Sequence, residues 1–116
     1  MRGALLIGAL AVVPSAQAAD SYPVKPVRLI VGFTPGGSTD LVGRLMATRL
    51  SERLGQQVVI DNRPGANGII AAELVAKAAP DGHTLLAMSI SHTMNAAVYK
   101  LPFDAVKSFT PITQLG

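Results

Sequence analysis

The order of apolar and amphipathic segments constrains the fold of this chain more than any other feature. Three short apolar runs have the character of strands, and two longer stretches with helical spacing separate them. The strand-like runs are residues 27–33, 57–61 and 84–89, and the helical stretches are residues 39–54 and 69–79. Apolar strands joined through helices by short connections favour a parallel sheet buried on both faces. The sequence therefore predicts an α/β fold of βαβαβ order, in which helices flank a mostly parallel sheet.

The first helical stretch has the clearest hydrophobic spacing, and the spacing is less clear after residue 89. Apolar side chains recur every four positions along the stretch, at Val42, Met46, Leu50 and Leu54. Gly55 follows, where a C-terminal cap glycine belongs. Residues 91–99 are expected to form a further helix or a loop, and residues 109–115 a fourth extended segment.

Three connections are expected to meet at one edge of the sheet. They are residues 34–39, 62–68 and 89–93, and each is rich in small or polar side chains. In parallel α/β sheets, ligands bind beyond the carboxyl ends of the strands. These three turns are therefore the place to look for a binding site.

The N-terminus has the pattern of a secretory signal peptide at residues 1–18. Arg2 supplies a positive charge, an apolar run covers residues 4–13, and Ala16-Gln17-Ala18 matches a small-residue cleavage pattern. We expect cleavage after Ala18 and export to the periplasm, with a buried N-terminal helix as the alternative. Residues 19–116 would then be the mature part, and they are expected to be the front of a longer protein.

Composition excludes several classes of function. The chain has no cysteine, which removes disulfides, thiol nucleophiles and thiolate metal sites. Its net charge of +3 comes from scattered lysines and arginines that form no basic stripe, so we expect no nucleic-acid partner. The two histidines, His83 and His92, have no further ligand at helical spacing, and we expect neither a metal nor a cofactor.

The first of the three turns, Pro35-Gly36-Gly37-Ser38-Thr39-Asp40, suits an anion site. The glycines let a ligand approach the backbone, and the first amides of the following helix have no acceptor within the helix. Ser38 or Thr39 suits the N-cap, and Asp40 suits the first helical turn. The turn can bind an anion, or it can simply cap the helix, with Asp40 holding its shape.

The other two turns offer similar donors. Ala66, Asn67 and Gly68 precede the second helix and leave amides accessible, while the neighbouring Arg63 is expected to pair with Asp61. Ser89, Ser91 and His92 supply hydroxyls and an imidazole in the third turn. His83 follows a Pro-Asp-Gly turn and is expected to be exposed.

The sequence argues against two kinds of enzyme site. A hydrolase would need a serine in a G-x-S-x-G elbow, and none is present. A dinucleotide site would place Asp61 near a ribose, but the G-x-G-x-x-G pattern is missing, because Gly43 is the next glycine after Gly36-Gly37. No catalytic residue is assigned.

Several motifs together resemble the Bug/TctC family, the extracytoplasmic solute receptors of tripartite tricarboxylate transporters. They are YP-x-KP at residues 22–26, F-x-PGG-S-x-D at 33–40, LGQ at 54–56, NRPGA-x-G at 62–68, A-x-PDG-x-TLL at 78–86 and LPFD-x-VK-x-FTPI at 101–112. Their order and spacing cover essentially all of the mature part. Gly32 departs from the family, since many relatives have proline there, and the chain is much shorter than the family's usual length.

The resemblance implies a two-lobed periplasmic binding protein, of which this chain would be an incomplete first lobe. It implies a small di- or tricarboxylate, or a related organic acid, as the ligand, a membrane permease as the partner, and a monomer when complete. The ligand-binding residues carried over are Pro35, Gly36, Gly37, Ser38, Thr39, Asp40, Ala66, Asn67, Gly68, Ser89, Ser91 and His92. An exported α/β enzyme or a signalling receptor with the same anion-binding turns remains the alternative.

Overall fold

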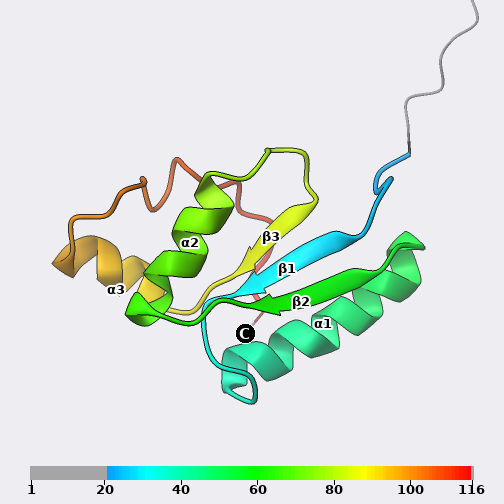
Figure 1. The fold of residues 1–116 in the computed structure, drawn as a ribbon, viewed down its shortest axis with the longest axis horizontal. Helices are drawn as coiled ribbons and strands as arrows, with labels where there is room; N and C mark the ends of the chain where they lie inside the picture. Colours follow the sequence, from blue (N-terminus) through cyan, green and yellow to red (C-terminus); the bar gives the residue numbers. More distant parts are fainter. Residues whose placement is uncertain (1–20, 116) are drawn as a thin grey trace, which may run out of the picture.

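The computed structural model describes residues 21–115 and forms a parallel sheet with helices on both faces (Figure 1). Its elements are β1 (Val27–Val31), α1 (Ser38–Leu54), β2 (Val58–Asn62), the short 3-10 turn η1 (Ala66–Gly68), α2 (Ile69–Ala76), β3 (Thr84–Ala87) and α3 (Ser91–Val98). The sheet has three strands in the order β2-β1-β3, and both pairings are parallel. The predicted α/β fold of βαβαβ order is confirmed.

Strand β1 is the centre of the core. Val27, Ile30 and Val31 are fully buried, and Leu29 is nearly so. Since side chains alternate along a strand, Leu29 and Val31 share one face and Ile30 occupies the other. Both faces of this strand are therefore covered, as its nearly continuous apolar sequence predicts.

Small residues let the helices approach β1 closely. A Cβ at Gly43 of α1 would lie 3.3 Å from Cγ2 of Val31, so glycine keeps this helix against the sheet. On the opposite face, Ala71 and Ala72 of α2 are buried. A Cβ at Gly32, directly after β1, would lie 3.0 Å from Cα of Gly68. The turns after β1 and β2 therefore touch through backbone.

Two expectations about the chain ends have different outcomes. Residues 99–115 contain no helix or strand, so the fourth extended segment expected at residues 109–115 does not join the sheet as a strand. Pro111 lies in this segment and has no amide hydrogen to donate to a neighbouring strand, and Ile112 is 75% exposed. The predicted signal peptide at residues 1–18 lies outside the described residues.

Within residues 21–115, the helices are all too short or too polar to span a membrane.

The expectation that His83 is exposed is wrong. Its residue is 9% exposed, and the ring packs edge-on against Tyr22, with 5.0 Å between the ring centroids. The Pro80-Asp81-Gly82 turn directs it inward, because the Asp81 carboxylate accepts the His83 amide at 3.0 Å. His83 lies just before β3, at the amino end of the sheet. The three candidate turns lie at the opposite end, after the carboxyl ends of the strands.

One buried carboxylate holds the turn between β1 and α1. Asp40 is 1% exposed and accepts three hydrogen bonds: from the amide of Gly36 at 2.9 Å, from Nε of Arg44 at 2.8 Å and from Nδ2 of Asn62 at 2.8 Å. Nδ2 of Asn62 also donates to the carbonyl of Phe33 at 3.1 Å. Asp40 thus ties the turn to its own helix and to the end of β2.

The N-cap of α1 differs from the prediction. Gly37 is the N-cap residue, and no side chain caps the helix, so the capping role expected for the Ser38 or Thr39 hydroxyl is wrong. Asp40 instead lies in the first helical turn, as predicted, and bonds back to the Gly36 amide. The serine and threonine hydroxyls are not used as caps because the helix begins one residue earlier than expected.

The same contacts stabilise the charged form of Asp40. Hydrogen bonds from Arg44, Asn62 and the Gly36 amide lower the pKa of this carboxyl to about 2, with the Arg44 contact the largest cause. A carboxyl whose pKa is lower in the folded state stabilises the fold at pH values above its unfolded pKa of about 4. That stabilisation is lost as the pH falls through about 2.

We therefore predict that Asp40→Asn removes part of the acid sensitivity of folding. Unfolding free energies measured by urea titration at closely spaced pH values should fall less steeply between about pH 4 and about pH 2 in the variant than in the wild type. At neutral pH the variant should be less stable, because it loses the charge-assisted bonds to Arg44. Glu52→Gln, on the exposed side of the same helix, is the control. Equal flattening in both variants would contradict the role of Asp40.

Candidate functional site

The turns that follow the three strands lie at the same end of the sheet. Figure 1 shows the arrowheads of β1, β2 and β3 pointing the same way, with the start of α2 and of α3 beyond them. The turn after β1 leads into α1, the turn after β2 contains η1, and the turn after β3 leads into α3. The parallel topology thus gathers the three sequence segments that carry the predicted site residues.

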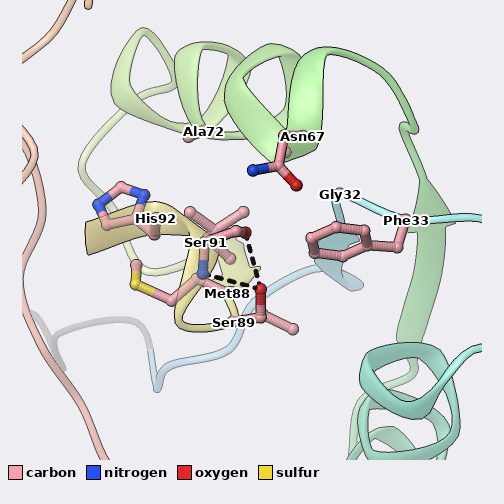
Figure 2. Close-up of a pocket in the computed structure, with 11 residues that line it drawn as sticks. Gly32, Phe33, Asn67, Ala72, Met88, Ser89, Ser91 and His92 are labelled. Atoms are coloured by element: carbon pink, nitrogen blue, oxygen red, sulfur yellow. Dashed lines mark hydrogen bonds between the residues drawn. The ribbon is translucent and has the colours of Figure 1, made fainter. Parts of the chain in front are cut away.

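A small pocket opens between the second and third turns. Figure 2 shows its walls, which come from the ends of β1 and β3 and from η1, α2 and α3. Its lining residues are Gly32, Phe33, Asn67, Gly68, Ala72, Leu86, Ala87, Met88, Ser89, Ser91 and His92. Five predicted site residues therefore come together here: Asn67, Gly68, Ser89, Ser91 and His92.

The remaining predicted residues lie outside this pocket. Residues 35–40 and Ala66 are absent from its lining, so the start of α1 is a separate group of donors at the same sheet edge. Phe33 and Gly32 line the pocket although they were not predicted, and the half-buried ring of Phe33 lies within van der Waals reach of Gly68. Their place directly after the central strand is the signal that could have identified them.

The first turn presents amide donors at the start of a long helix. The amides of Ser38, Thr39 and Asp40 have no acceptor within the helix, since the amide of Leu41 is the first to bond back, at 2.9 Å to the Gly37 carbonyl. The Gly36 amide already donates to Asp40. Ser38 is exposed, and Gly36 has a φ of 92°, which favours glycine. The helix start can therefore receive an anion, with the Ser38 hydroxyl beside it.

The second turn has a left-handed backbone. Gly65, Ala66, Asn67 and Gly68 have φ values of 136°, 47°, 54° and 89° in succession. A left-handed conformation costs about 1–2 kcal/mol for a residue other than glycine. The turn is closed by the Gly68 amide, which donates to the Gly65 carbonyl at 3.1 Å. Such a run of positive φ values at a candidate site must be held by its surroundings.

Asn95 of α3 supplies that support, and the sequence analysis did not identify it. Its Nδ2 donates to the Asn67 carbonyl at 2.9 Å, and its Oδ1 accepts from Nδ2 of Asn67 at 3.0 Å. Asn95 is only 4% exposed. Its spacing of four residues from Ser91 could have indicated that the two share a helix face, but only if α3 had been firmly assigned as a helix.

The third turn brings two hydroxyls together. Oγ of Ser89 and Oγ of Ser91 lie 2.8 Å apart, and the Ser91 amide donates to Oγ of Ser89 at 3.3 Å (Figure 2). One hydroxyl must donate to the other, so the accepting hydroxyl keeps its own hydrogen for a further bond. The pair can therefore donate to an anionic oxygen in the pocket.

His92 has a structural environment. Its Nε2 donates to the carbonyl of Ala105 at 2.9 Å, and its ring stacks on Phe103 and meets Phe109 edge-on, with centroid separations of 6.0 and 5.2 Å. These contacts fix residues 103–109 against α3. The ring lines the pocket, but its Nε2 is not directed at Ser89 or Ser91, which argues against a serine–histidine catalytic pair.

The charged residues near the turns are paired with each other. Asp61 accepts from Arg63 at 2.8 Å and also bonds to Arg28. The Arg63 contact, followed by the Arg28 contact, lowers the pKa of Asp61, and Asp61 in turn raises the pKa of Arg63. The self-paired interpretation of Arg63 is therefore confirmed, and the lining of the pocket includes no lysine or arginine. Across residues 21–115, no cluster of acidic or histidine side chains could hold a metal ion.

This chain is similar in sequence to a known protein family. The family model of the tripartite tricarboxylate transporter family receptor, TctC, matches residues 42–116. Protein BugT of Bordetella pertussis is 41% identical over 101 residues, which cover 84% of this chain and 31% of that protein. A second relative, from Bordetella bronchiseptica, is 47% identical over 102 residues, which cover 86% of this chain and 30% of that protein. The chain thus spans about a third of the length of these relatives.

Solved structures agree with the sequence relatives. The malate-bound protein MatC from Rhodopseudomonas palustris aligns with a TM-score of 0.69 at 42% identity, over 78% of this chain and 31% of that one. An R. palustris protein, Rpa4515, with adipate aligns with a TM-score of 0.55 at 54% identity, over 56% of this chain and 22% of that one. The parallel βαβαβ fold is thus shared with these solved structures, and the chain belongs to the TctC family of tripartite tricarboxylate transporter receptors.

Proposed function

We propose that this protein binds a small organic carboxylate outside the cytoplasm and delivers it to the permease of a tripartite tricarboxylate transporter. The ligand class is a dicarboxylate, a tricarboxylate or a related organic acid. One carboxylate of the ligand is held at the sheet edge by backbone amides and hydroxyls of the three turns. The residues assigned to this contact are Pro35, Gly36, Gly37, Ser38, Thr39, Asp40, Ala66, Asn67, Gly68, Ser89, Ser91 and His92.

The observation that supports this proposal most is the convergence of neutral donors at the carboxyl edge of one parallel sheet. The α1 start offers amides and the Ser38 hydroxyl, and the pocket offers the Ser89–Ser91 pair beside Asn67 and Gly68. Oriented amides and hydroxyls bind anions without a cationic side chain. The ligands of two related structures, malate and adipate, are both dicarboxylates.

The remaining parts of the proposal concern the export, location, oligomeric state and lack of catalysis of the whole protein. Residues 1–18 are assigned as a signal peptide cleaved after Ala18, and the mature protein acts in the periplasm as a monomer. It uses no cofactor and performs no catalysis. The hydrogen bond from Nε2 of His92 to the Ala105 carbonyl supports a binding role over a hydrolytic one, because this nitrogen cannot at the same time accept a proton from a serine nucleophile.

Ligand class is tested first by thermal unfolding of the full-length protein, including any residues encoded beyond Gly116. The protein is scanned against mono-, di- and tricarboxylates, amino acids and NAD. A ligand at a hundred times its dissociation constant should stabilise the protein by about 2.7 kcal/mol, which raises Tm by a few degrees. We expect this shift with one class of carboxylate. A protein that responds only to NAD, or to none of the carboxylates, would refute the proposed function.

The contribution of the first turn is tested by Ser38→Ala. Loss of one hydrogen bond to the carboxylate should weaken binding by about 1 kcal/mol, or roughly fivefold, in a calorimetric titration. Thr48→Ala is the matched control, because the Thr48 hydroxyl lies on the same helix and donates to the Arg44 carbonyl at 3.1 Å. If both variants bind with wild-type affinity, Ser38 makes no contact with the ligand.

A further inference from the structure

The left-handed turn after β2 depends on a side chain that belongs to another element. We propose that Asn95 is a positioning residue for ligand binding, which holds residues 65–68 in the conformation that exposes the Ala66 and Asn67 amides as donors. This inference rests on the proposed function, since it names the side chain that keeps one carboxylate-binding turn in shape. Asn95 itself contacts the turn and lies outside the pocket lining.

The hydrogen bonds show why Asn95 acts on this turn specifically. Both polar atoms of its amide bond to Asn67, one to the backbone carbonyl and the other to the side-chain nitrogen. Asn95 is 4% exposed, so an unpaired amide there would carry a desolvation cost. The two hydrogen bonds between Asn95 and Asn67 therefore stabilise the observed conformation of Asn67, which has a φ of 54°.

The donors that this arrangement frees are the amides of Ala66 and Asn67. The Gly68 amide donates to the Gly65 carbonyl and closes the turn. Within residues 21–115, the backbone amides of Ala66 and Asn67 donate no hydrogen bond. Consecutive amides in such a turn form a concave donor surface for an anion. A return of Ala66 and Asn67 to negative φ would turn these amides away from their present directions.

Helix α3 joins this support to the third turn. Ser91 and Asn95 are four residues apart and so lie on the same face of α3, one turn from each other. Ser91 lines the pocket, and a Cβ on Gly68 would lie 3.9 Å from its Oγ. One helix thereby fixes the distance between the Ser89–Ser91 hydroxyls and the amides of the second turn.

Two substitutions of Asn67 separate the backbone conformation from the side-chain bond. Asn67→Ala and Asn67→Gly both delete the bond to Oδ1 of Asn95, but only glycine adopts positive φ without steric cost. In calorimetric titrations of the full-length protein with malate, and with adipate in parallel, we expect Asn67→Gly to bind about fivefold more tightly than Asn67→Ala. Equal affinities, or tighter binding by Asn67→Ala, would overturn the inference.

Asn95→Leu tests the support from the other side. Leucine has a similar volume and removes both hydrogen bonds to Asn67, so we expect binding to weaken about tenfold or more. Adding Asn67→Gly to Asn95→Leu should restore part of the affinity, because glycine no longer needs to be held. Leu54→Ala is the stability control, since Leu54 packs against the core at the far end of α1. An Asn95→Leu protein that binds as well as wild type, or a double variant without recovery, would contradict the proposal.

A measurement without ligand separates this inference from the proposed function. In Asn95→Leu, hydrogen exchange of the Gly68 amide should be at least about tenfold faster than in wild type, while exchange of the β1 amides changes far less. Unchanged exchange at Gly68 would overturn the positioning role whatever the protein binds. If wild type binds none of the carboxylates but exchange at Gly68 accelerates, the function is wrong and the support by Asn95 stands.

Discussion

Strand β1 is buried on both faces, and this burial determines where the helices and the edge turns lie. A strand in the middle of a parallel sheet must be covered by helices on each side, and the helices must come close to exclude water. Gly43 and Ala47 of α1 meet one face, and Ala71 and Ala72 of α2 meet the other. Parallel pairing then brings the ends of all three strands to one edge, where the turns that lead into the helices must lie.

Two of the three candidate turns are kept in shape by polar contacts with another part of the chain. Asp40 and Asn62 fix the turn after β1, and Asn95 fixes the turn after β2. The carboxylate and the amides that do this are themselves buried or half-buried, so their hydrogen bonds have defined partners and geometry. The donors left over are backbone amides and serine hydroxyls, which are preorganised for a ligand and carry no net charge.

These pairings explain how acidic side chains can lie beside the proposed carboxylate site. Asp40 and Asp61 are both held charged, with lowered pKa values, but each is neutralised by arginine and by hydrogen-bond donors. Arg44 and Arg63 are consequently engaged within the protein and are not available as counter-ions. Recognition of a carboxylate at this edge would rest on directional hydrogen bonds, which select geometry, more than on charge attraction.

Hydrophobic spacing and glycine signals are local, so the βαβαβ order, the first helix with its Gly55 cap and the three edge turns could be predicted from the residues alone. The Asp61–Arg63 pair could also be predicted, because it joins near neighbours. The burial of His83, the packing of His92 against Phe103 and Phe109, and the lack of a strand at residues 109–115 became evident only from the folded structure. The bonds of Asp40 to Asn62 and of Asn67 to Asn95 join residues 22 and 28 positions apart. No local pattern encodes such contacts, since they exist only once the helices have packed on the sheet.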